Sequence, residues 1–237
     1  MPPTPPSAPP PAAASPARSG SPAAAAPEPV AAKPAPAKTV AAVTLAKGPP
    51  RFVSRVGYVP AAKFGRTWRP GCPVPRGRLR LVRLSHWGFD GKVHTGELVL
   101  RDRVVKDVTY VFRKAFEAKF PIRKMQVMAV YGGSDPRAMA DDNTSAFNCR
   151  GVTGNPGSLS QHSYGDAIDI NTLENPYVDW SGRVYPAAGA RYLNRRHHRP
   201  GMIHSGSALT KAFRQVGWSW GARWSNPDYQ HFSANGR

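Results

Sequence analysis

The chain has 237 residues, 26 of them proline, and a formal net charge of +19. Residues 1–50 contain 15 of the prolines and no Phe, Trp or Tyr, so they cannot bury enough apolar surface to offset the entropy of ordering. The composition excludes a hydrophobic core there. It predicts a disordered Pro/Ala-rich linker over 1–50 and one folded domain over 51–237.

Most of the positive charge belongs to the predicted domain. Residues 1–50 hold four basic residues and one acidic residue, which leaves a net charge of +16 for residues 51–237. A basic surface of this kind attracts polyanions. Nucleic acid is not the expected partner, because the chain lacks a basic helix, an aromatic platform and zinc-finger spacing.

No membrane span is predicted, because no apolar run reaches the ~18 residues that a span needs. The N-terminal region also lacks the basic start and the leucine-rich core that are typical of a signal peptide. A leader upstream of Met1 and a different export route both remain open.

The first half of the domain is expected to form a hairpin and a helix. Near-alternating apolar residues predict a strand over 78–84, and a second strand over 92–100 follows the Asp90-Gly91 turn. Apolar residues at helical spacing predict a helix over 107–120. The expected buried face of this helix consists of Val108, Val111, Phe112, Ala115, Phe116 and Phe120.

The middle of the domain is expected to alternate short strands with loops. Residues 122–131 are predicted to form a buried strand, and a polar loop follows as far as Cys149. A short strand is predicted over 166–171. Because successive side chains of a strand point to opposite faces, this strand directs Asp169 away from Asp166.

The C-terminal part completes the predicted fold. A long loop over 172–203 is expected to form a rim or lid over the functional site. Ser205 or Ser207 is predicted to cap the following helix, and a last strand is predicted over 229–233. Because strands and helices do not alternate strictly, the elements predict an α+β fold in which helices flank a small antiparallel sheet.

Two short segments supply residue types that bind zinc. The first contains His162 and Asp169, and the second contains Asp228 and His231. Two histidine nitrogens and one carboxylate oxygen make a three-ligand zinc site, which leaves a fourth position for water. We therefore predict one zinc ion bound by His162, Asp169 and His231. Asp228, in the turn before the last strand, is predicted to be the general base for the water.

The same segments resemble a known family of hydrolases. Its pattern is Ser-x-His-x-x-Gly-x-Ala-x-Asp, then a Trp-rich segment, then Asp or Glu-x-x-His. The matching positions here are Ser160, His162, Gly165, Ala167, Asp169, Trp218, Trp220, Asp228 and His231. Over about residues 91–232 the chain thus resembles the zinc D-alanyl-D-alanine carboxypeptidase and L-alanyl-D-glutamate peptidase family, which acts on bacterial cell-wall peptides.

The resemblance implies roles for further residues. The family places its general base at the position of Asp228, in agreement with the argument from chemistry. Arg150 matches a position at which the family binds the substrate's carboxylate, and the fork of a guanidinium suits such a contact. Ser160 is implied to bind the substrate or to steady the loop.

The implied function is zinc-dependent hydrolysis of short peptidoglycan peptides that contain D-amino acids, with a D-Ala-D-Ala-type carboxypeptidase as the first interpretation. The expected partners are peptidoglycan stem peptides or their precursors, together with anionic cell-wall polymers. The protein is expected to be an extracytoplasmic monomer. Since that compartment is oxidising, Cys72 and Cys149 are predicted to form a disulfide, the alternative being two buried thiols.

Two other functions remain open at this level. An endopeptidase that cuts between L-Ala and D-Glu would use the same ligands, and would differ in whether the pocket closes around a free carboxylate. A non-catalytic module would use the +16 charge to adhere to the cell wall. The presence of Asp228 argues against that module, because a binding protein does not need a general base.

Overall fold

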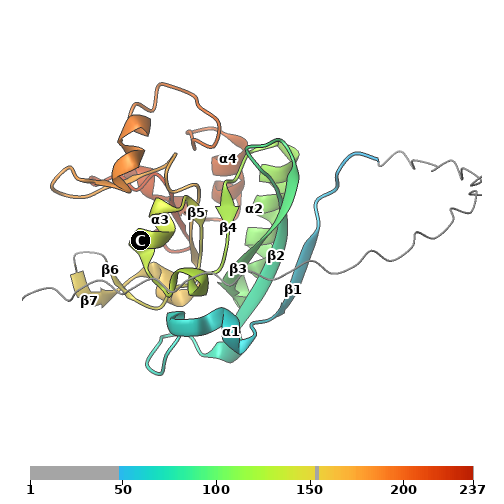
Figure 1. Ribbon diagram of the computed structural model, residues 1–237, viewed down its shortest axis with the longest axis vertical. Coiled ribbons are helices and arrows are strands. Elements are labelled where there is room, and N and C mark those ends of the chain that lie inside the picture. The colour runs from blue at the N-terminus through green and yellow to red at the C-terminus, as the bar shows by residue number, and fades with distance from the viewer. Residues whose placement is uncertain (1–47, 153–154, 237) are drawn as a thin grey trace, which may run out of the picture. The chain divides into compact units, whose positions relative to one another are not determined.

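The computed structural model describes residues 48–152 and 155–236 (Figure 1). Residues 1–47 of the predicted linker lie outside the described residues. The described residues belong to the unit Lys47–Arg237. Among them, no helix combines the length and the apolar character that crossing a membrane requires.

The fold mixes short helices with small sheets, which confirms the predicted α+β class. The helices are α1 (Ala61–Phe64), α2 (Val105–Glu117), α3 (Asp135–Ala140) and α4 (Ala208–Gln215). The strands are β1 (Ser54–Tyr58), β2 (Leu79–Trp87), β3 (Val93–Arg101), β4 (Lys124–Met125), β5 (Asn143–Thr144), β6 (Gly151–Val152), β7 (Asn155–Leu159), β8 (Ala167–Asp169), β9 (Tyr177–Val178), β10 (Val184–Tyr185), β11 (Ser219–Trp220) and β12 (His231–Ser233). Short 3₁₀ helices connect them: η1 (Gly65–Thr67), η2 (Arg76–Arg78), η3 (Asp102–Val104), η4 (Met128–Tyr131), η5 (Gln161–Tyr164), η6 (Ala187–Tyr192) and η7 (Gly221–Arg223).

The longest strands form an antiparallel sheet in the order β1-β2-β3. β2 and β3 are the predicted hairpin, and their register places Leu79 opposite Arg101 and Trp87 opposite Val93. Helix α2 runs alongside both strands in Figure 1 and packs on β2. Its buried side chains are Val108, Val111, Phe112, Ala115 and Phe116, as predicted, while Phe120 follows the helix and is partly buried.

A second antiparallel sheet, in the order β11-β12-β8, shares the core of the first. Helices α2 and α4 pack against each other, and Ile168 of β8 and Phe232 of β12 are fully buried in the same apolar cluster. Burying a side chain of this size stabilises a fold by about 1.5–3 kcal/mol. The apolar core therefore fixes β8 and β12 against the rest of the domain. These strands carry the predicted zinc ligands Asp169 and His231.

Two predictions for the middle of the chain were wrong. Within 122–131, the extended part is limited to β4, and η4 follows it. A short apolar run does not distinguish a buried strand from a buried turn, and here Gly132 takes φ +64° and ends η4. The predicted polar loop contains α3, whose cap Ser134 and early Pro136 are ordinary helix-start signals.

The long segment 172–203 has structure of its own. It contains the β9–β10 hairpin and η6. Hydrogen bonds from Arg195 connect residues near the two ends of this segment. The guanidinium of Arg195 donates to Glu174 O at 2.8 Å, to Ile203 O at 2.8 Å and to Asn175 Oδ1 at 2.9 Å. These contacts fix the base of the hairpin that approaches the candidate site.

Candidate active site

The second sheet brings Asp169 and His231 together. They are directly opposite each other on the antiparallel strands β8 and β12. Residues in such a pair project from the same face, with Cβ atoms about 4.5–5.5 Å apart. Asp169 Oδ1 lies 3.0 Å from His231 Nδ1. Two residues that are 62 positions apart therefore meet because of strand register.

His162 reaches the same point from η5. Ser160 caps η5, and its Oγ accepts a hydrogen bond from His162 N at 3.3 Å. Gly165 then turns the chain into β8 with φ +69°. A Cβ on Gly165 would lie 2.8 Å from the backbone N of Arg101, so this turn requires glycine.

Taking one candidate ligand atom from each side chain, the three atoms of His162, Asp169 and His231 lie within 4.8 Å of one another. His162 Nε2 is 3.1 Å from Asp169 Oδ2 and 3.2 Å from His231 Nδ1, and all three residues are buried. Ligand atoms about 2.0–2.2 Å from a tetrahedral zinc ion are roughly 3.3–3.6 Å apart. The observed separations would need only small adjustments to accommodate the ion.

The tautomer of His162 also fits a cation. Its Nδ1 lies 2.7 Å from Ala146 O. Because a carbonyl oxygen only accepts, Nδ1 carries a hydrogen, and in the neutral form of this ring the lone pair is on Nε2. Nε2 faces the carboxylate of Asp169. In the protonated ring it donates to that carboxylate, and in the neutral ring a metal ion between the two groups would be favourable to both. The backbone contact also orients the ring, as is usual for histidines that bind metals.

The two carboxyl groups of the site have opposite electrostatic environments. Burial raises the pKa of Asp169, but the charge and hydrogen bond of His162, with the contacts of His231, lower it well below its ordinary value. Burial, followed by the charge of Asp169, raises the pKa of Asp228 to about 7. Its Oδ1 is buried without a hydrogen-bond donor among the described residues. A polar group that enters the site can therefore satisfy Asp228.

These residues share one cavity of about 270 Å³. It is lined by every site residue predicted from the sequence, which are Arg150, Ser160, His162, Asp169, Asp228 and His231. Tyr177, Tyr185 and Trp224 add aromatic walls. The two tyrosines stack with ring centroids 6.0 Å apart, and they come from the segment that was expected to form a rim. The β9–β10 hairpin thus supplies part of that wall.

Arg150 is held near the ligand loop by its backbone. Its N donates to Ser163 Oγ at 3.0 Å, and its O accepts from Ser160 N at 3.0 Å. The preceding residue forms the predicted disulfide, in which the Cα atoms of Cys72 and Cys149 are 6.0 Å apart. Arg150 is therefore positioned both by a covalent link and by the loop that carries His162.

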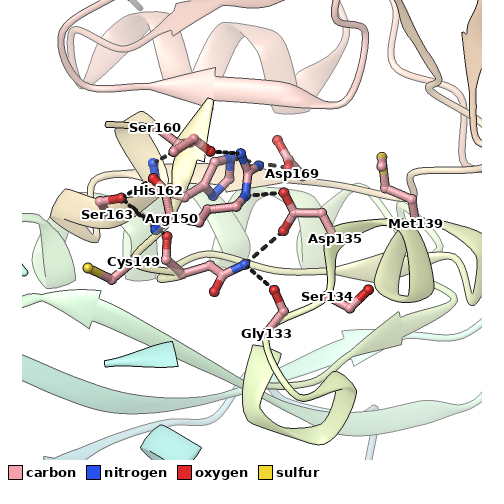
Figure 2. A network of polar contacts seen from close by, with 12 residues as sticks. Gly133, Ser134, Asp135, Met139, Cys149, Arg150, Ser160, His162, Ser163 and Asp169 are labelled. Carbon is pink, nitrogen blue, oxygen red and sulfur yellow. Dashed lines mark hydrogen bonds and ion pairs between the residues drawn. The ribbon is translucent and has the colours of Figure 1, made fainter. Parts of the chain in front are cut away.

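Three residues of this site were missed by the sequence analysis. Ser163 joins the two loops through its hydroxyl, Asp135 forms an ion pair with Arg150, and Asn148 donates to Asp135 (Figure 2). Asp135 and Asn148 lie far from the motifs in the chain, and no spacing pattern connects them. Ser163 lies inside the first motif, at a position that the family pattern leaves open.

Comparison with known proteins gives one family. Residues 153–234 match the family model described as D-alanyl-D-alanine carboxypeptidase. This range contains the three predicted zinc ligands and Asp228, whereas Arg150 lies before it. Neither the curated proteins nor the solved structures give a significant match. The resemblance predicted from the two motifs is thus confirmed over residues 153–234, and it supports a peptidase related to the D-alanyl-D-alanine carboxypeptidases.

Proposed function

We propose that the protein is a zinc-dependent peptidase that hydrolyses short peptidoglycan peptides containing D-amino acids, acting as a D-Ala-D-Ala-type carboxypeptidase. The observation that carries this proposal is the convergence of His162, Asp169 and His231 in one cavity with Asp228. The family match supports the peptidase class. The free carboxylate of such a substrate gives Arg150 a ligand in the same cavity.

In this proposal His162, Asp169 and His231 hold one zinc ion. When bound, zinc acts as a Lewis acid that polarises the scissile carbonyl and makes water a nucleophile near neutral pH. Asp228 accepts a proton from the attacking water as the new C–O bond forms. It delivers that proton to the leaving amine as the C–N bond breaks.

Other residues bind and orient the peptide. The guanidinium of Arg150 pairs with the carboxylate of the substrate. Ser160 steadies the loop, since its Oγ already accepts the hydrogen bond from His162 N. Tyr177, Tyr185 and Trp224 provide apolar surface that excludes bulk water from the reacting groups.

The proposed place of action is outside the cytoplasm, at the bacterial cell wall. The Cys72–Cys149 disulfide supports this location, because such bonds persist in oxidising compartments. Peptidoglycan stem peptides or their precursors are the proposed substrates. The net charge of +16 over residues 51–237 favours association with anionic wall polymers.

The proposal is tested by incubating the zinc-loaded full chain with stem peptides that end in D-Ala-D-Ala, and by identifying the products by mass. Asp228→Asn should lower turnover by about 10²–10⁴-fold, the range that a positioned general base contributes. Asp90→Asn is a matched control, because it neutralises an exposed carboxylate in the turn between β2 and β3. Its turnover should equal that of the wild type.

The product masses also decide between the two peptidase activities. Release of a terminal D-Ala supports the carboxypeptidase, whereas cleavage after L-Ala establishes the endopeptidase. No turnover of any wall peptide by the fully zinc-loaded wild type would overturn the proposal. In that case, binding to insoluble cell walls that weakens with added salt would identify an adhesive module.

A further inference from the structure

Arg150 does not rely on a substrate to order its side chain. Its Nε is ion-paired with the carboxylate of Asp135, and its Nη1 donates to Gly151 O at 2.9 Å (Figure 2). No hydrogen-bond acceptor for Nη2 is found among the described residues. The side chain is 26% exposed and lines the cavity. Two of the three guanidinium nitrogens thus have partners, while the group still faces the cavity.

Asp135 is itself held in place. It is the first residue of α3, and its side chain is 14% exposed. Its Oδ1 accepts a hydrogen bond from Asn148 Nδ2 at 2.8 Å. The same amide donates to Gly133 O at 3.0 Å, in the turn that precedes α3. These contacts form a chain from Gly133 through Asn148 and Asp135 to Arg150, and Figure 2 shows the side chain of Asp135 pointing toward that of Arg150.

The ion pair is not needed to place the backbone of Arg150. Its N and O are already bonded to Ser163 and Ser160, and Cys149 is linked to Cys72. What the contact with Asp135 adds is the direction of the side chain. Ordering a long side chain on binding weakens affinity by roughly two- to tenfold. A partner that orders it beforehand removes that cost.

We propose that Asp135 is a positioning residue, which fixes the Nε edge of Arg150 so that its remaining donors face the carboxylate of a peptide substrate. This inference rests on the proposed function, in which Arg150 binds that carboxylate. Because Ser163 and Ser160 join Arg150 to the loop of His162, the ion pair also sets where the carboxylate lies relative to the metal ligands. Asp135 acts through Arg150 and does not touch the reacting atoms.

The first test uses two peptides that differ only in a C-terminal carboxylate or carboxamide. Asp135→Asn should raise KM for the carboxylate peptide by roughly three- to tenfold and leave kcat within about twofold, since one side chain loses its prior order. The carboxamide peptide should show no change in KM. The amide keeps an oxygen that can accept from Asn148, so packing around α3 changes little.

Two further variants exclude a merely structural effect. In an Arg150→Ala background, Asp135→Asn should have no additional effect on KM, because the residue acts through Arg150. Asp141→Asn removes an ion-paired carboxylate at the other end of α3, outside the cavity, and should match the wild type. If Asp135→Asn fails to fold, Asp135→Ala takes its place, because its shortened side chain opens onto the cavity.

A second readout does not depend on turnover. In a ¹⁵N spectrum, the Nε–H signal of Arg150 is identified by its absence in Arg150→Lys. It should exchange slowly with water in the wild type and rapidly in Asp135→Asn. If the wild type cleaves no peptide, the proposed function fails. Titration of the carboxylate peptide into wild type and Asp135→Asn, together with this signal, then decides the inference independently.

Three results would overturn the inference. The first is an equal KM for wild type and Asp135→Asn on the carboxylate peptide. The second is a fall in kcat with KM unchanged, which would show that Asp135 does not act through substrate binding. The third is a rapidly exchanging Nε–H of Arg150 in the wild type, which would show that the ion pair does not order the side chain in solution.

Discussion

The side chains of this site have two different proposed roles. Three of them would hold a metal ion, and one would transfer a proton. His162, Asp169 and His231 present donor atoms to one point, whereas Asp228 lies in the turn before β12 and outside that cluster. The division follows from the backbone. Asp169 and His231 are paired across the sheet, while Asp228 pairs with Tyr177 of the neighbouring hairpin.

This division predicts different effects on zinc binding. His231→Ala removes a proposed ligand and should lower zinc affinity by more than roughly 100-fold, because even groups that only orient a ligand contribute 10- to 100-fold. Asp228→Asn should keep zinc at wild-type stoichiometry. Zinc content after dialysis against a competing chelator is the measurement. Equal retention by the two variants would refute the assigned ligand set.

At the scale of elements, the turn between η5 and β8 determines whether His162 and Asp169 can meet. Gly165 has φ +69°, and its backbone approaches that of Arg101. Gly165→Ala adds a Cβ at 2.8 Å from Arg101 N, at a φ that costs an L-residue about 1–2 kcal/mol. We expect a stability loss of at least that size, measured by urea unfolding. Gly91→Ala is the control, because it shares a positive φ and meets no atom within 4 Å.

The disulfide between Cys72 and Cys149 also connects separate elements of the fold. It links the region before β2 to the residue that precedes Arg150, across 77 positions of sequence. In the chain-entropy model a loop of this length stabilises the folded state by about 4 kcal/mol. The double variant Cys72→Ala, Cys149→Ala should lose a stability of that order in unfolding experiments. Addition of reductant should destabilise the wild type and leave the variant unchanged.

For the molecule as a whole, a buried acidic cluster makes stability depend on pH. Glu174 is fully buried, and its Oε1 lies 3.3 Å from Arg123 Nη2. Burial, followed by a hydrogen bond that the protonated side chain of Glu174 donates to the carboxylate of Asp142, raises the pKa of Glu174 to about 7. The folded state therefore binds a proton that the unfolded state, with a pKa near 4.5, has released.

The sign of the effect follows from this difference. Between about pH 4.5 and 7 the folded state holds more protons, so the contribution of Glu174 to stability decreases as pH rises, by up to about 3 kcal/mol. Glu174→Gln keeps an acceptor for Arg123 and removes the titration. The free energy of unfolding should therefore fall with pH more steeply in the wild type than in this variant. Parallel curves for the two proteins over this range would contradict the prediction.

Local sequence patterns were sufficient for several parts of this protein. The helical spacing of Val108, Phe112 and Phe116 located α2, and alternation along 78–100 located the hairpin, because both periods are set by neighbouring residues. His162 and His231, which the structure brings together, could be named from the sequence as candidate metal ligands, since few residue types bind zinc. The pairing of Cys72 with Cys149 followed from the chain having two cysteines and an expected oxidising location.

Other features of the fold and of the candidate site depend on tertiary structure and could not be predicted from local sequence patterns. Within the apolar run 122–131, Met128–Tyr131 form η4 where a strand was expected, because burial favours apolar side chains in either conformation. The pairing of Asp169 with His231 depends on strand register, and the contact of Asp135 with Arg150 depends on where α3 packs. Periodicity extends over a few residues, whereas these contacts join positions 15 to 62 residues apart. Only the folded core determines which of them meet.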